Sequence, residues 1–116
     1  MDSLSPETLH RWRQILEKTL QHYADIPNRY EEIREYVIVS RDLNHFLLMQ
    51  EGWHGKDRSH GPIVHAEIRE GKIWIHYDGI EDSITEDIVT EGIPKDKIVL
   101  GFHPPHVRPH TGYAVA

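Results

Sequence analysis

The stretch "IVHAEIREGKIWIHYDG", residues 63–79, predicts a tight antiparallel hairpin around which the other elements can be placed. Glu70 and Gly71 can form a two-residue turn, because glycine accepts the positive φ angle that such turns require. If Arg69 pairs with Lys72, the side chains of the two strands separate onto opposite faces of the sheet. The core face would carry Val64, Ala66, Ile68, Ile73, Ile75 and Tyr77, and the other face His65, Glu67, Trp74 and His76.

This pairing sets His65 directly opposite His76 and Glu67 directly opposite Trp74. A face that only contacts water rarely has this composition, and buried tryptophans commonly anchor interfaces. We therefore expect the face opposite the core to form part of an interface or a shared site.

The N-terminus predicts a helix that begins with Ser5 as its cap and Pro6 at its first position. Its apolar residues recur at spacings of three and four, and the stretch from Asp25 to Asn28, with Pro27, should end it. The inward stripe of this helix consists of Leu9, Trp12, Leu16, Leu20 and Tyr23.

The remaining elements are predicted from changes in the spacing of apolar residues along the sequence. Residues 32–53 predict a second hairpin with a turn at 41–44, and the glycine-rich, polar residues 52–62 predict an irregular loop. Residues 82–92 predict a short helix with a capping box at Ser83 and Glu86, a buried side of Ile84, Ile88 and Val89, and a stop at Gly92. Residues 98–100 predict a last buried strand. This order predicts a single α+β domain over residues 1–116, a mainly antiparallel sheet of two hairpins with both helices packed on it.

Composition excludes several classes of function. The 116 residues carry a formal charge of -6 without a basic run, so the chain is a poor binder of bare nucleic acid. The absence of cysteine excludes disulfides, thiolate metal ligands and a thiol nucleophile. No apolar run is long enough for a membrane span and the N-terminus does not resemble a signal peptide, so we expect a cytoplasmic protein.

Ten histidines raise the alternative of a metal site or a histidine-dependent nuclease that uses His65, His76 and His103. In the tail, His103, His106 and His110 stand at spacings of three and four. The intervening prolines predict a stiff, extended tail in which this spacing carries little weight. An acid/base pair of His103 with Glu67 or Asp78 also stays open.

The segments "GWHG", "GPIVHAEIREGKIWIHYDGIED", "GIPKDKIVLGFHPP" and "TGYAVA" resemble, in this order and at matching separations, the XisI family of cyanobacterial proteins. These proteins are the fdxN element excision controlling factors. The resemblance covers nearly the whole chain and is strongest from Gly52 onward.

The resemblance implies a regulatory role rather than a reaction. The family acts with a companion called XisH in the excision of a DNA element during heterocyst development, while a separate recombinase cuts and rejoins the DNA. It supplies no catalytic residues to carry over. We therefore expect a non-enzymatic controlling factor with an XisH-like partner. We also expect a homodimer, no cofactor and no direct binding to nucleic acid or membrane.

The resemblance also ranks the candidate residues. The positions that match the family pattern are Gly52, Trp53, Gly55, Arg58, Gly61, His65, Trp74, Asp78, Gly79, His103, Pro105, Arg108, Thr111 and Gly112. His54, His60, His76, His106 and His110 depart from the pattern, which weakens the interpretation of the tail as a metal site. As candidates for partner binding we take Trp53, Gly55, Arg58, His65, Trp74, Asp78, His103, Arg108 and Thr111.

Overall fold

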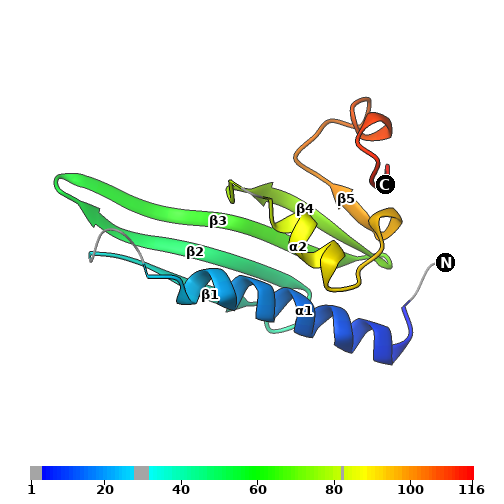
Figure 1. Ribbon diagram of the computed structural model, residues 1–116, viewed down its shortest axis with the longest axis horizontal. Helices are drawn as coiled ribbons and strands as arrows, with labels where there is room; N and C mark the ends of the chain where they lie inside the picture. The colour runs from blue at the N-terminus through cyan, green and yellow to red at the C-terminus, as the bar shows by residue number, and fades with distance from the viewer. Residues whose placement is uncertain (1–3, 28–31, 82) are drawn as a thin grey trace.

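The computed structural model of the protein describes residues 4–27, 32–81 and 83–116. Two helices lie on one face of a five-stranded sheet, which confirms the α+β class (Figure 1). The elements are α1 (Pro6–Asp25), β1 (Ile33–Val39), β2 (His45–His54), β3 (Asp57–Arg69), β4 (Lys72–Asp78), α2 (Ile84–Thr90), η1 (Lys95–Lys97), β5 (Ile98–Leu100) and η2 (Arg108–His110).

Helix α1 begins as its sequence predicts. Ser5 Oγ accepts a hydrogen bond from the backbone N–H of Thr8, and Pro6 occupies the first turn. The helix ends at Asp25, and Asn28, to which the predicted end extended, lies outside the described residues. Trp12, Leu16 and Leu20 are buried. Leu9 and Tyr23, at either end of the predicted stripe, pack against the core while partly exposed.

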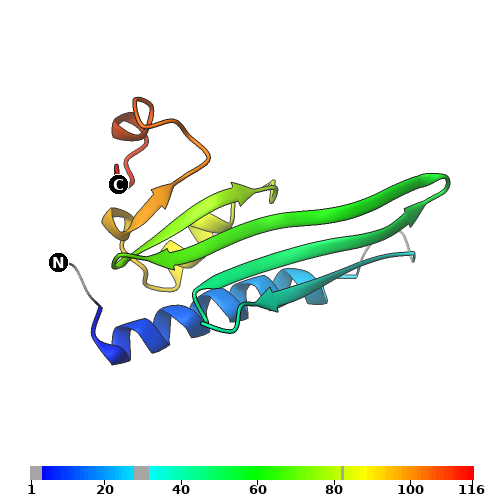
Figure 2. The ribbon, with the colours of Figure 1, turned by 180° about the vertical axis from the view of Figure 1, so that it is seen from behind.

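The strand order in the sheet is β1-β2-β3-β4-β5, the same as the order along the chain. The first four strands form an antiparallel meander, and β5 pairs in parallel with β4. Between β4 and β5 the chain crosses the helical face through α2. Seen from behind, the strands lie in front of both helices (Figure 2). One face of the sheet is therefore covered by helices, and the other is not.

The core lies between the sheet and the two helices. Phe46, Leu48, Val64, Ala66, Ile73 and Ile75 face it from the strands, each with 1% or less of its surface exposed. Helix α2 contributes Ile84 and Ile88, and its cap is Ser83, whose Oγ accepts from the backbone N–H of Thr85. Gly92, with a φ of 115°, follows the end of α2 as predicted. No helix among the described residues has the length and apolar character needed to cross a membrane.

The prediction of an irregular loop at residues 52–62 is wrong. Strand β2 continues to His54, β3 begins at Asp57, and Gly55 with Lys56 forms a two-residue connection. This hairpin projects past the end of β4 and gives the molecule its long axis of 49 Å (Figure 1). Gly61 and Pro62 are tolerated because this part of β3 is a sheet edge, where backbone irregularity disturbs no further strand, and Gly55 lies in the turn itself.

The predicted pairing of β3 with β4 holds near the turn and shifts beyond it. Arg69 pairs with Lys72 and Glu67 with Trp74, as predicted. A β-bulge between His65 and Ala66 then sets His65 opposite Tyr77 instead of His76. Tyr77, predicted to face the core, is 51% exposed.

The tail after β5 is folded, so the prediction of an extended tail is also wrong. Turns follow Gly101, the 3-10 helix η2 comes next, and Ala114 then forms a bridge with Val99. The backbone N–H of Ala114 donates to the carbonyl of Ile98 at 2.8 Å. The tail therefore lies against β5.

Candidate interaction surface

Three histidines meet on the face of the sheet that the helices leave uncovered. His45 at the start of β2, His65 on β3 and His76 on β4 come together around Glu67, and we call these four residues the histidine cluster. His45 Nδ1 lies 3.0 Å from His65 Nε2, and the rings of His65 and His76 have centroids 4.9 Å apart. The bulge in β4 preserves this proximity although His65 and His76 are not directly paired.

Glu67 connects the cluster through both of its carboxylate oxygens. Oε1 lies 2.9 Å from His76 Nε2, and Oε2 lies 3.4 Å from His45 Nε2. Arg69 approaches the same carboxylate at 3.8 Å. One carboxylate is therefore shared by two imidazoles and a guanidinium.

His65 is the member of the cluster whose titration is clearly perturbed. Burial lowers the pKa of His65 below its ordinary value, and the neighbouring His76 and His45 lower it further, while Glu67 acts in the opposite direction. The neutral imidazole is therefore favoured, which suits its hydrogen bond with His45.

The cluster does not have the geometry of a metal site. Among residues 4–27, 32–81 and 83–116, no three His, Asp or Glu side chains are placed to hold one ion. His103, the third residue of the metal and nuclease alternative, packs against Phe102 in a tilted arrangement, with ring centroids 4.5 Å apart. Glu67 is engaged by His45 and His76, and Asp78 by backbone amides, so neither carboxylate has His103 as its partner.

Trp74 links the cluster to the tail. Its ring stacks with that of His76, and the guanidinium carbons of Arg69 and Arg108 lie 4.0 and 5.3 Å from the centroid. Arg108 Nε donates to the carbonyl of His103 at 3.0 Å, and Thr111 Oγ1 donates to the carbonyl of Arg108 at 2.8 Å. Three of the predicted site residues, His103, Arg108 and Thr111, thus hold the folded tail in place.

Asp78 has a structural role as well. Its Oδ1 accepts from the backbone N–H of Ile80 at 3.0 Å. Its Oδ2 accepts from the backbone N–H of Ile84 at 3.1 Å and from Ser83 Oγ at 3.2 Å. The carboxylate therefore fixes the chain between β4 and α2 and satisfies an N–H at the start of that helix.

Trp53, Gly55 and Arg58 lie together at the far end of the β2–β3 hairpin, and we call residues 53–58 the arm tip. Trp53 is 48% exposed, with the Arg58 guanidinium 5.4 Å from its ring centroid. Arg58 also binds Glu51 at 3.2 Å, and Gly55 adopts a φ of 61° in the turn. A half-exposed tryptophan on a projecting hairpin is a candidate contact for another protein.

Gly52, which matches the family pattern, is required by packing. A Cβ atom at this position would lie 1.9 Å from the carbonyl oxygen of Glu32, and its φ of 150° disfavours other residues. The glycine thus lets the backbone before β1 approach β2, where the Trp53 N–H donates to Glu32.

An apolar stripe beside the histidine cluster was missed by the sequence analysis. Tyr36 pairs with Met49, and Ile38 pairs with Leu47, which in turn pairs with His65. Ile38 is 41% exposed, while Phe46 and Leu48 on either side of Leu47 face the core. The alternation in residues 33–39 and 45–49 contains this signal, and the register between β1 and β2 would have revealed it.

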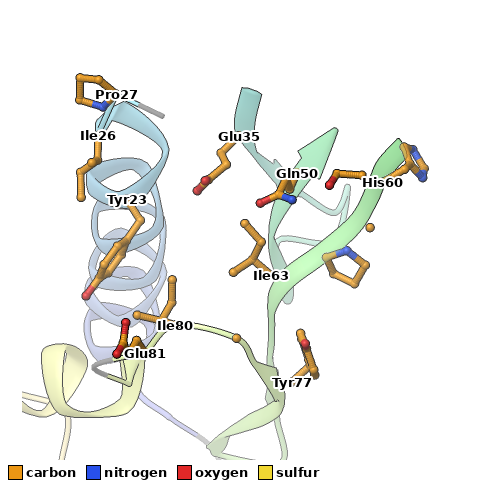
Figure 3. A pocket seen from close by; sticks show the side chains of 14 residues that line it. Tyr23, Ile26, Pro27, Glu35, Gln50, His60, Ile63, Tyr77, Ile80 and Glu81 are labelled. Carbon is orange, nitrogen blue, oxygen red and sulfur yellow. The ribbon is translucent and has the colours of Figure 1, made fainter. Parts of the chain in front are cut away.

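A separate groove lies on the helical side, between the end of α1 and the β2–β3 hairpin (Figure 3). Its volume is about 690 Å³, and Tyr23, Ile26, Glu35, Gln50 and Ile63 are among its lining residues. None of the nine residues predicted to bind a partner lines it. The predicted sites therefore lie outside this groove.

These features define a class of protein: an α+β domain whose five-stranded sheet carries both α-helices of the described chain on one face. A sequence model described as XisI protein matches residues 6–115 of the chain. Because this match spans nearly the whole sequence, the chain belongs to the XisI family.

Two solved structures from Anabaena variabilis ATCC 29413 share the fold. A XisI-like protein has a TM-score of 0.85 and 30% sequence identity, with 93% of this chain and 99% of that chain covered. The fdxN element excision controlling factor XisI has a TM-score of 0.78 and 31% identity, with 93% and 98% covered. No match was found among curated proteins.

Proposed function

We propose that this chain is a controlling factor for the excision of a DNA element and that it acts through protein contacts rather than by breaking bonds. The similarity to the fdxN element excision controlling factor XisI over 93% of this chain supports this proposal. In more detail, we propose that the partner is an XisH-like protein. We also propose that the chain acts in the cytoplasm of a cyanobacterium, where it controls site-specific recombination during heterocyst development.

The distribution of charge supports a protein partner that itself binds DNA. The sequence from 81 to 91 contains five carboxylic acids and neither lysine nor arginine. Glu86 and Asp87 lie in the first turn of α2, on the helical side. An acidic surface repels bare DNA, but it increases the encounter rate with a basic DNA-binding protein.

A genetic experiment tests the role in excision. In a strain that carries this gene beside an XisH-like gene and a removable element, deletion of the gene should abolish the junction formed by excision. The junction is measured by PCR, and reintroducing the gene should restore it. Normal excision in the deletion strain would refute the proposal.

Co-expression tests the partner. The chain and the XisH-like protein should co-purify and elute together on a sizing column. Separate elution at every ratio would exclude a stable complex of the two.

An activity assay tests the non-enzymatic part of the proposal. The purified chain should leave single- and double-stranded DNA and RNA intact, with and without divalent metal ions. Cleavage that disappears in His65→Ala or His103→Ala would instead support the histidine-dependent nuclease.

A further inference from the structure

The face of the sheet opposite the two helices collects positive charge, and we call it the open face (Figure 2). The 13 lysine and arginine residues form no basic run in the sequence, but the fold brings several of them to this one face. The strand register and the folded tail place five cations here: Arg34, Arg58, Arg69, Lys72 and Arg108. In the described strands β1 to β4, they are accompanied on this face by two carboxylates, those of Glu51 and Glu67.

These two carboxylates are less exposed than the cations beside them. The side chain of Glu51 is 28% exposed, next to Arg34 at 69% and Arg58 at 43%. The side chain of Glu67 is 17% exposed, next to Arg69 at 43%. Charges are largely screened beyond about 8 Å at physiological ionic strength, so the acidic residues near α2, on the other side of the sheet, weaken this potential little. The open face therefore presents positive charge although the whole chain carries -6.

Every guanidinium group of the open face lies against an aromatic ring. The guanidinium carbon of Arg34 is 4.6 Å from the ring centroid of Tyr36, and that of Arg69 is 4.0 Å from the ring centroid of Trp74. A ring contact holds the guanidinium in a fixed plane, while N–H groups at its edge can still contact a phosphate. The full set of pairs is Arg34 with Tyr36, Arg58 with Trp53, and both Arg69 and Arg108 with Trp74.

The tail covers one part of the open face without adding acidic side chains. A Cβ atom at Gly101 would lie 3.3 Å from Trp74 Cε3, so the tail lies against this ring. Residues 97–116 contain two cations and three histidines but neither Asp nor Glu. Trp74 therefore positions guanidinium groups, and the rings left for a ligand are those of Tyr36 and the half-exposed Trp53.

We propose that the open face binds single-stranded nucleic acid, with phosphates on its cations and bases on the rings of Tyr36 and Trp53. Proteins that bind single strands without sequence preference combine a positively charged surface with aromatic side chains in this way. A duplex keeps its bases stacked inside, and an acidic protein has no planar bases, so neither would use both features. This contact goes beyond the proposed control of excision, and it replaces the expectation that the chain does not touch nucleic acid.

Fluorescence anisotropy with the purified chain tests this assignment. The probe is a labelled oligothymidylate of about 20 nucleotides, longer than the roughly 4–16 nucleotides that one OB-fold occupies. At about 50 mM salt we expect saturable binding with a dissociation constant below about 100 μM, and a loss of affinity as the salt concentration rises. An oligouridylate of the same length compares RNA with DNA.

Two lysines provide a matched pair of variants. Lys72 lies on the open face and Lys18 is exposed on α1, so Lys72→Gln and Lys18→Gln change the net charge equally. Each phosphate contact of a single strand contributes about 0.7 to the slope of log affinity against log salt concentration. Lys72→Gln should lower this slope by about 0.7 and the affinity at about 50 mM salt about fivefold, whereas Lys18→Gln should change neither.

Two further variants extend the test to the other end of the open face. Arg34→Gln should lower the slope as Lys72→Gln does. Trp53→Ala should lower the affinity about tenfold and leave the slope unchanged, because it removes a stacking surface and no charge. Thermal melts followed by circular dichroism check that each variant is folded.

Several outcomes would overturn the assignment. Absence of binding at about 50 mM salt with about 100 μM protein would exclude it. Equal losses in Lys72→Gln and Lys18→Gln would place the contact away from the open face. A hairpin duplex bound as tightly as the single strand would exclude stacking of bases, and polyglutamate bound as tightly would identify an acidic protein as the ligand. The assay uses the chain alone, so its result does not depend on the proposed role in excision.

Discussion

His45 Nδ1 lies 3.0 Å from His65 Nε2, so one ring donates the shared proton and the other accepts it. A second proton would make both nitrogens donors and remove the hydrogen bond. Protonation of His65 would therefore disrupt the histidine cluster.

Acid should destabilise the fold through His65. Its pKa is lowered in the folded state, mainly by burial, so the unfolded chain binds the proton more tightly. The contribution of neutral His65 to the free energy of unfolding is complete above the pKa of the unfolded state, about 6.5. It is lost as the pH falls from there through the pKa of the folded state. Urea unfolding at about pH 7.5 and pH 5.5 should show this loss. His65→Gln should reduce the pH dependence and the exposed His106→Gln should not, and equal slopes in all three chains would contradict the prediction.

Replacement of Asp78 should destabilise the protein through the segment before α2. Asp78→Ala leaves the N–H groups of Ile80 and Ile84 without their acceptor, at a cost of about 1–2 kcal/mol in the free energy of unfolding. Asp78→Asn retains a carbonyl acceptor and should lose less. Thermal melts followed by circular dichroism provide the comparison. If alanine and asparagine behave alike and match the unmodified chain, the carboxylate does not stabilise this segment.

Replacement of Arg108 should loosen the tail rather than unfold the whole chain. Arg108→Ala removes the hydrogen bond to the His103 carbonyl and the contact with Trp74. Hydrogen exchange at Thr111, Tyr113 and Ala114 should accelerate about tenfold or more, as expected for a local loss of about 1.4 kcal/mol. Arg108→Lys keeps the charge but not the planar guanidinium, so it should rescue little. Exchange that rises equally across the core would indicate global destabilisation instead.

The two tryptophans Trp53 and Trp12 should respond very differently to truncation. Trp12 is 3% exposed in the core, so Trp12→Ala should cost about 3–5 kcal/mol. Trp53 is 48% exposed at the arm tip, and Trp53→Ala should stay within about 0.5–1 kcal/mol of the unmodified chain. Denaturant unfolding measures both. If Trp53→Ala also loses the XisH-like partner in co-purification, the arm tip is part of that contact. Retention of the partner would assign the contact to another surface.

Features that depend only on residues close together in the sequence could be predicted. The turn at Glu70 and Gly71, the cap at Ser5 and the burial of Trp12 and Leu16 were all predicted from local pattern. Their causes lie within one turn or one hairpin, where spacing alone determines which side chains meet.

Features that depend on relations between hairpins could not be predicted. The position of His45 beside His65 requires the register of β2 on β3, which no turn residue reports. The bulge that sets His65 opposite Tyr77 is a one-residue offset without a sequence signature. Gly61 and Pro62 resemble loop residues, and only an edge strand accommodates them in a sheet.

The remote position of Gly55 and Lys56 has an evolutionary consequence. Each strand gains about 3.4 Å per residue and alternates its side chains with a period of two. Inserting two residues on each side of this turn would extend the reach of the hairpin by about 7 Å and leave every existing side chain on its original face. Chains with the same core can thus diverge in the distance at which they touch another molecule, while the residues that hold the fold together stay unchanged.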